Sequence, residues 1–174
     1  MNFDKSLKYY LKDKDYYINS ECHVNVYQRF YDVNYEEIEK RDYKIKYVTG
    51  LLIGELGEEK FCYIHSWIEI NNEVIDVTSM ANLFNRVNFD VTSEMLELLK
   101  QEVANTTKYM PIKSISDIDF TMLVKKMARE NWTENIAKSM ENYILGIISD
   151  IENDKVLKEK QENAGYRFVK EYNN

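Results

Sequence analysis

Two cysteines and two histidines are the side chains of this 174-residue chain best suited to nucleophilic or metal-binding chemistry. Cys22 follows residues 19–21 (Asn-Ser-Glu), whose residue types cap helix N-termini, so we expect Cys22 in the first turn of a helix. A thiol at such a position is stabilised as the thiolate by the helix dipole and by unpaired backbone N–H groups, which lowers its pKa. Cys22 is therefore the candidate nucleophile.

His65 lies in a segment rich in β-branched and aromatic residues, which predicts a strand over residues 59–70. The period of two in a strand places Tyr63, His65 and Trp67 on one face. The opposite face carries Cys62, Ile64, Ser66 and Ile68. His65 and Cys62 therefore point apart, and we expect Cys62 to be a core residue.

Three antiparallel strands are predicted in this part of the chain, at residues 44–54, 59–70 and 73–78. Asn71 and Asn72 separate the second strand from the third, and asparagine tolerates the positive φ that tight hairpin turns require. The turn fixes the register of the two strands.

In that register Trp67 lies opposite Asp76 and His65 lies opposite Thr78, so that His65 and Asp76 are diagonal neighbours on one face. A carboxylate on a largely apolar strand needs a partner, because burying an unpaired charge is costly. His65 is the expected partner. Asp76 would orient the imidazole, and the imidazole would exchange protons with Cys22 and the leaving group, as acyl transfer through a thioester requires.

Four short motifs occur in the order Cys22-His-Val-Asn25, Tyr47-Val-Thr-Gly50, His65-Ser-Trp67 and Val74-Ile-Asp76-Val-Thr78. Together they resemble the core of the transglutaminase-like and papain-like cysteine enzymes, in which a helical Cys precedes a His closely followed by Trp and an Asp closely followed by Thr. The resemblance covers about residues 19–79. It implies the triad Cys22, His65 and Asp76, and an acyl transfer at an amide: hydrolysis of a peptide or isopeptide bond, or deamidation or transamidation of a glutamine. Whether water or an amine accepts the acyl group is left open.

Further residues are expected to support this site. The resemblance implies that Trp67 and Thr78 shape it. Asn25, one turn after Cys22, either contacts the substrate or packs on the helix surface. The oxyanion would be bound by the Cys22 backbone N–H, with a tyrosine hydroxyl or the Asn19 amide as the second donor.

Helical periodicity dominates the rest of the chain. It predicts helices over residues 4–17, 93–104, 117–131, 134–150 and 154–172, with Thr92 and Thr133 as caps. In the first, Leu7, Tyr10 and Leu11 share a face. In the fourth, an apolar stripe predicts a core face and consists of Ile136, Met140, Tyr143, Ile144, Ile147 and Ile151.

The predicted fold class is α+β: an N-terminal helix carrying the Cys packs on a small antiparallel sheet, and a helical C-terminal half follows. One domain over residues 1–174 is expected, with a catalytic core at about 19–79 and a helical part at about 92–172.

Composition excludes several functional classes. The chain is 44% hydrophobic and 30% charged, which is typical of globular proteins, and its net charge of -7 argues against nucleic-acid binding. No segment resembles a signal peptide or a membrane span, so a cytoplasmic protein with reduced thiols is expected. We expect a protein or peptide substrate, no cofactor and no membrane partner; the sequence indicates no oligomeric state.

Two alternatives stay open. Cys22, His23, Cys62 and His65 offer four ligands of types that zinc accepts, but Cys62 and His65 face opposite ways on a strand. The other alternative is a non-catalytic binding module, in which the helical part from residue 93 onward engages a protein and the acidic surface suits a basic partner.

Overall fold

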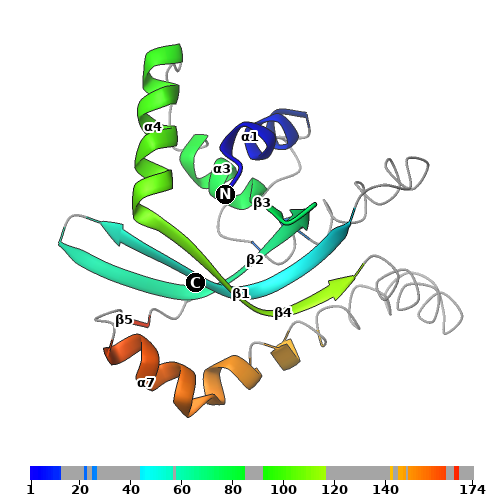
Figure 1. Ribbon diagram of the computed structural model, residues 1–174, viewed down its shortest axis with the longest axis vertical. Helices are drawn as coiled ribbons and strands as arrows, with labels where there is room; N and C mark the ends of the chain where they lie inside the picture. Colours follow the sequence, from blue (N-terminus) through cyan, green and yellow to red (C-terminus); the bar gives the residue numbers. More distant parts are fainter. Residues whose placement is uncertain are drawn as a thin grey trace, which may run out of the picture.

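The computed structural model describes residues 1–12, 22, 25–26, 44–56, 58–84, 92–116, 142, 145–147, 149–163 and 167–168. Its elements in chain order are α1 (Phe3–Lys12), β1 (Ile45–Leu56), β2 (Glu59–Ile70), β3 (Glu73–Ile75), α3 (Val77–Phe84), α4 (Ser93–Thr106), β4 (Thr107–Ser116), α7 (Lys155–Asn163) and β5 (Arg167–Phe168). Figure 1 shows α1, α3 and α4 on one side of the sheet and α7 on the other. This arrangement confirms an α+β architecture.

The sheet has the strand order β3-β2-β1-β4, and all neighbours in this order are antiparallel. β1 and β2 pair along their whole length, which confirms the first two predicted strands. β5 is short and pairs in parallel with β2 at Phe61 and Cys62. β2 is thus a central strand, and its side chains project alternately toward the two faces of the sheet.

Asn71 and Asn72 form the turn between β2 and β3 and both have positive φ, at 53° and 65°. Ile68 pairs with Ile75, which is the register predicted from this turn. The prediction that the third strand continues to residue 78 was wrong, because β3 ends at Ile75.

Asp76 ends the strand because it caps the following helix, α3. Its Oδ1 accepts a hydrogen bond from the Ser79 backbone N–H at 2.9 Å, as an N-cap carboxylate does for the third helical residue. The backbone N–H of Asp76 in turn donates to the Ser6 hydroxyl at 3.0 Å. Asp76 is therefore held at the junction of β3 and α3, rather than within a strand.

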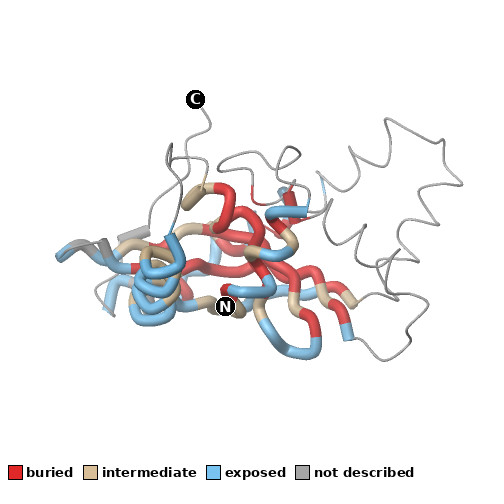
Figure 2. Tube along the Cα trace, turned by 90° about the horizontal axis from the view of Figure 1, so that it is seen from above, coloured by how far each residue is buried: buried red, intermediate tan, exposed pale blue. Residues whose placement is uncertain are grey.

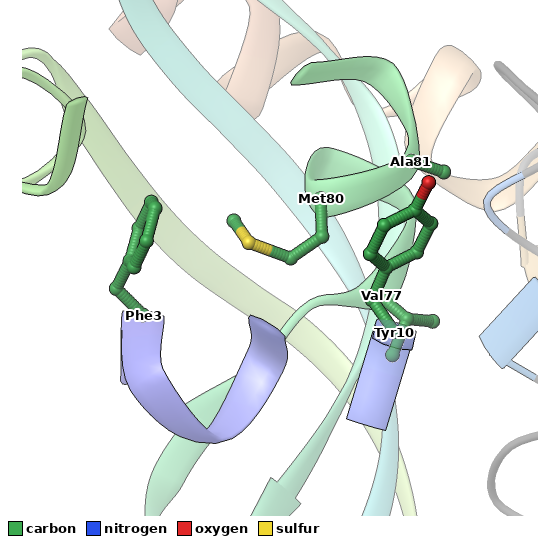
Figure 3. Close-up of a cluster of buried hydrophobic side chains, with 5 residues drawn as sticks. All are labelled: Phe3, Tyr10, Val77, Met80 and Ala81. Atoms are coloured by element: carbon green, nitrogen blue, oxygen red, sulfur yellow. The ribbon is translucent and has the colours of Figure 1, made fainter. Parts of the chain in front are cut away.

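An apolar cluster joins α1 to α3 on this side of the sheet. Its buried members are Phe3, Tyr10, Val77, Met80 and Ala81. Figure 3 shows the Met80 side chain extending from α3 toward Phe3 of α1. The predicted first helix is confirmed as far as Lys12, but Leu11 is 58% exposed and does not belong to the buried face.

The C-terminal half is not the helical unit that was predicted. α4 agrees with the sequence, including its cap, since the Thr92 hydroxyl accepts from the Met95 N–H. The next residues form strand β4, which no helical or strand prediction covered, and the helix predicted over 154–172 is described only as α7, with Arg167–Phe168 in strand β5. The predicted helix over 117–131 lies outside the described residues, as does the Thr133 cap.

The opposite side of the sheet packs on helical residues near the C-terminus. The cluster there consists of Leu51, Ile64, Ile147, Ile151 and Leu157. It confirms a core role for Ile147 and Ile151, while the other four residues of the predicted stripe lie outside the described part. Figure 2 shows that the buried stretches gather in the middle of the molecule, where the strands lie. No helix within the described ranges is long and apolar enough to cross a membrane.

Candidate active site

On the face of β2 that α1 and α3 cover, two aromatic side chains of the same strand flank His65. The rings of His65 and Trp67 stack with centroids 6.4 Å apart, and Tyr63 meets His65 edge-on at 5.7 Å. On the opposite face, the Ser66 hydroxyl pairs with the hydroxyls of Tyr47 and Thr49. The predicted division of β2 into two faces is confirmed.

His65 and Asp76 form a buried ion pair. Nε2 of His65 lies 2.7 Å from Oδ2 of Asp76, and the two side chains are 2% and 0% exposed. This contact confirms that Asp76 partners His65, although Asp76 reaches it from the cap of α3 rather than from a strand. The short distance is that of a charge-assisted hydrogen bond.

Opposing influences set the pKa values of this pair. Burial would raise the pKa of Asp76, but the charge of His65 and hydrogen bonds from His65 and Ser79 lower it from 3.8 to about 2. Burial would lower the pKa of His65, but the charges of Asp76 and Cys22 and hydrogen bonds with both raise it well above 6.5. Asp76 is therefore ionised at neutral pH, and it favours the imidazolium form of His65.

Asp76 accepts more hydrogen bonds than the one from His65. The Ser79 hydroxyl donates to Oδ2 at 2.5 Å, and the Tyr109 hydroxyl donates to the same oxygen at 2.7 Å. Together with the Ser79 N–H on Oδ1, these donors fix both the position and the ionised state of the carboxylate. Such a carboxylate can hold an imidazole in one orientation.

The second ring nitrogen of His65, Nδ1, is buried and has no hydrogen-bond partner at full geometry among the described residues. Cys22 nevertheless acts on His65, since its charge and side chain raise the pKa of the imidazole. The Cys22 side chain therefore interacts with the imidazole of His65. Cys22 is helical and only 1% exposed.

Two predicted supporting residues bond to each other. The Asn25 side-chain amide donates to the Thr78 hydroxyl at 3.1 Å, and both residues are 1% exposed. Asn25 thus ties the helical segment of Cys22 to the first turn of α3, which begins directly after Asp76. This bond favours a positioning role for Asn25. Asn19, the candidate oxyanion donor, lies outside the described residues.

Trp67 is fully buried and packs over Gly50 of β1. A Cβ atom at Gly50 would lie 2.8 Å from Cη2 of Trp67 and 2.1 Å from the backbone oxygen of Met110. The β1–β4 register also shifts between Thr49 and Gly50, where a bulge brings Pro111 opposite Gly50. Only glycine leaves room for the indole beside His65 at this point.

Sequence reasoning missed two residues of the site, Ser79 and Tyr109. Ser79 lies three residues after Asp76, which is the spacing between an N-cap residue and the third residue of its helix. This pattern was overlooked because the segment was predicted to be a strand. Tyr109 lies on β4, which was not predicted, so no pattern placed it near His65. Its ring lies 6.3 Å from that of His65 and 5.2 Å from that of Trp67.

Cys62 lies away from this site. It is fully buried, its strand neighbour is Ile53, and burial raises the pKa of its thiol. A zinc site built from Cys62 and His65 is not compatible with their opposite faces on β2. No cluster of three or more potential ligands for a metal ion occurs in the part of the chain that the structure describes.

Comparison of the chain with known protein families, with curated proteins and with solved structures gives no significant match. The likeness to the transglutaminase-like enzymes therefore stays an expectation from short motifs. The chemistry of the site has to be inferred from its own residues.

Proposed function

We propose that this protein is a cysteine-dependent acyl-transfer enzyme that acts on an amide, with Cys22 as nucleophile, His65 as acid and base, and Asp76 as the orienting carboxylate. The observation that supports this most is the asymmetry of His65. One ring nitrogen is fixed on a fully ionised, buried carboxylate, and the other has no well-aligned partner among the described residues. A purely structural buried histidine would be expected to satisfy both nitrogens.

The reaction follows from this asymmetry. The bond from Nε2 to Asp76 keeps Nδ1 available, and Nδ1 takes the proton of the Cys22 thiol. The thiolate attacks the amide carbonyl carbon, the C–N bond breaks, and the imidazolium returns the proton to the departing amine. The product of this half is a thioester on Cys22.

Resolution of the thioester reverses these roles. Neutral His65 takes a proton from water or from an amine as that group attacks the thioester, and the thiol is restored when the C–S bond breaks. Water as acceptor gives hydrolysis or deamidation, and an amine gives transamidation. We propose a protein or peptide as the substrate.

An activated ester tests this proposal without knowledge of the natural substrate. Incubation with p-nitrophenyl acetate is expected to release a burst of nitrophenolate equivalent to the enzyme concentration, and peptide mapping is expected to find the acetyl group on Cys22. Cys22→Ala abolishes both signals. Cys62→Ala is the matched control, because it removes the other buried thiol from the opposite face of β2 and should leave the burst intact. Acetylation of Cys62 instead, or of neither cysteine, contradicts the proposal.

The burial of Cys22, which is 1% exposed, favours one alternative: a non-catalytic protein-binding module that retains the site only as a core. In that case the thiol has no need of activation. The absence of a burst, together with a loss of stability in Cys22→Ser, would support the module over the enzyme, because a hydroxyl is more costly to bury in a core than a thiol.

A further inference from the structure

Tyr109 connects strand β4 to the carboxylate that holds His65. Its hydroxyl lies 2.7 Å from Oδ2 of Asp76 and 3.3 Å from the sulfur of Met1. A hydroxyl has one proton to donate, and an ionised carboxylate is a much stronger acceptor than a thioether. The proton therefore lies on the bond to Asp76.

Tyr109 stays a hydrogen-bond donor throughout the working pH range. Burial, the negative charge of Asp76 and the hydrogen bond to it raise the pKa of Tyr109 well above 10. Its phenol cannot become a competing base or an added negative charge near His65. The ring itself is fixed by its edge contact with Trp67.

Three donors share one oxygen of Asp76. Oδ2 receives hydrogen bonds from His65 Nε2, from the Tyr109 hydroxyl and from the Ser79 hydroxyl. A carboxylate oxygen has about two lone-pair sites, so donors in excess of two compete for the same electron density. Each added donor lowers the basicity that the carboxylate presents to the imidazolium.

We propose that Tyr109 is a positioning residue that fixes Asp76 and limits how strongly Asp76 stabilises the imidazolium of His65. The inference rests on the proposed function for its biological meaning. A histidine held too strongly as imidazolium is a poor base for the second half of the reaction, when it must accept a proton from water or an amine. Tyr109 counteracts that by competing for Oδ2.

Several other titratable groups surround this pair in the described part of the chain and must be considered with it. Cys22 acts on His65 directly, and Tyr63 meets it edge-on from the same strand. The α-amino group of Met1 also interacts with Asp76. Burial lowers the pKa of this amino group, and the negative charge of Asp76 partly offsets that by raising it. None of these groups is removed when the Tyr109 hydroxyl is deleted.

Tyr109→Phe tests the proposal because it keeps the ring contacts and deletes only the hydroxyl. The pKa of His65 is measured by NMR titration of its imidazole nitrogens, with His23, the second histidine of the sequence, as the internal reference. We expect the pKa of His65 to rise by about 0.5 to 1 pH unit. The rise of the acylation rate on p-nitrophenyl acetate with pH, which follows the loss of the His65 proton, should move in the same direction.

Two further variants make the result decisive. Tyr47→Phe removes a buried tyrosine hydroxyl that bonds Ser66 on the opposite face, so it should lower stability without moving the His65 titration. Ser79→Ala removes a different donor from Oδ2, should raise the pKa of His65 as Tyr109→Phe does, and serves if Tyr109→Phe folds poorly. An unchanged or lowered His65 pKa in Tyr109→Phe and Ser79→Ala, or an equal shift in Tyr47→Phe, overturns the inference. The titration needs no turnover, so a missing acylation burst in the unmodified protein contradicts the proposed function alone.

Discussion

Asp76→Asn tests the ion pair most severely, because it keeps the size of the side chain and removes its charge. In the native site three donors meet Oδ2 and the Ser79 N–H meets Oδ1. An amide has one oxygen, so its NH2 group must face at least one of these donors. If the amide oxygen keeps the helix cap, the NH2 group faces His65.

The cost to stability follows from the pKa and the burial of Asp76. Its pKa is about 2 in the folded protein against an ordinary 3.8, a difference worth about 2 kcal/mol. Because the folded value is the lower one, this contribution is complete above pH 3.8 and is lost as the pH falls through about 2. At neutral pH the variant should lose about 3 kcal/mol, since the buried ion pair is broken and the NH2 group faces donors that had bonded to Oδ2.

Urea unfolding followed by tryptophan fluorescence, repeated between pH 2 and 7, measures both effects. The wild-type midpoint should fall in the acid window, and that of Asp76→Asn should start lower and fall less. Asp4→Asn is the matched control: Asp4 is 67% exposed, pairs with Lys100 at 2.6 Å, and should cost less than about 1 kcal/mol.

Asp76→Asn should also slow acylation of Cys22, because it changes which ring nitrogen of His65 carries the proton. Facing an NH2 group, Nε2 must accept a hydrogen bond, which places the proton on Nδ1, where it cannot take the thiol proton. The burst rate should drop by about 10³-fold or more. A variant that unfolds at the wild-type midpoint at pH 7 and acylates at the wild-type rate would refute the account of Asp76.

Three substitutions outside the triad give further predictions, each measured by urea unfolding. Gly50→Ala should destabilise by about 3 kcal/mol, because the new Cβ would lie 2.1 Å from the Met110 oxygen; near-native stability would contradict the close packing. Thr92→Ala should cost about 1 kcal/mol through loss of the bond to the Met95 N–H, with no change in acylation. Cys62→Ala should cost about 1 kcal/mol or more and leave Cys22 acylation intact; a loss of acylation would mean that the nucleophile was wrongly chosen.

The hairpin that holds His65 was predictable because local rules specify it. Two adjacent asparagines at positive φ fix the turn, and the period of two then fixes which side chains share a face with His65. The pairing of His65 with Asp76 followed from the same register, even though the strand ends earlier than predicted.

The elements around that hairpin were harder to predict because tertiary context decides them. Val77 and Thr78 favour strands by their β-branching, but the Asp76 cap and the apolar contacts of Val77 with α1 start a helix there. Pro111 argues against a strand, and β4 accommodates it at a bulge on the edge of the described sheet. Without β4 the sequence could not place Tyr109 beside Asp76.

The central claim, that His65 activates Cys22, is tested most directly by the pH dependence of cysteine alkylation. Native protein is treated with iodoacetamide across a range of pH, and each cysteine is followed by peptide mapping; the pH profile, rather than the absolute rate, is compared. Cys22 should react with an apparent pKa well below the value of about 8.5 for a free thiol, and His65→Ala should shift the profile back toward it. Cys62, whose thiol pKa is raised by burial, should show no reaction at pH values below those at which a free thiol reacts. A Cys22 profile equal to that of a free thiol and unchanged in His65→Ala would contradict the claim.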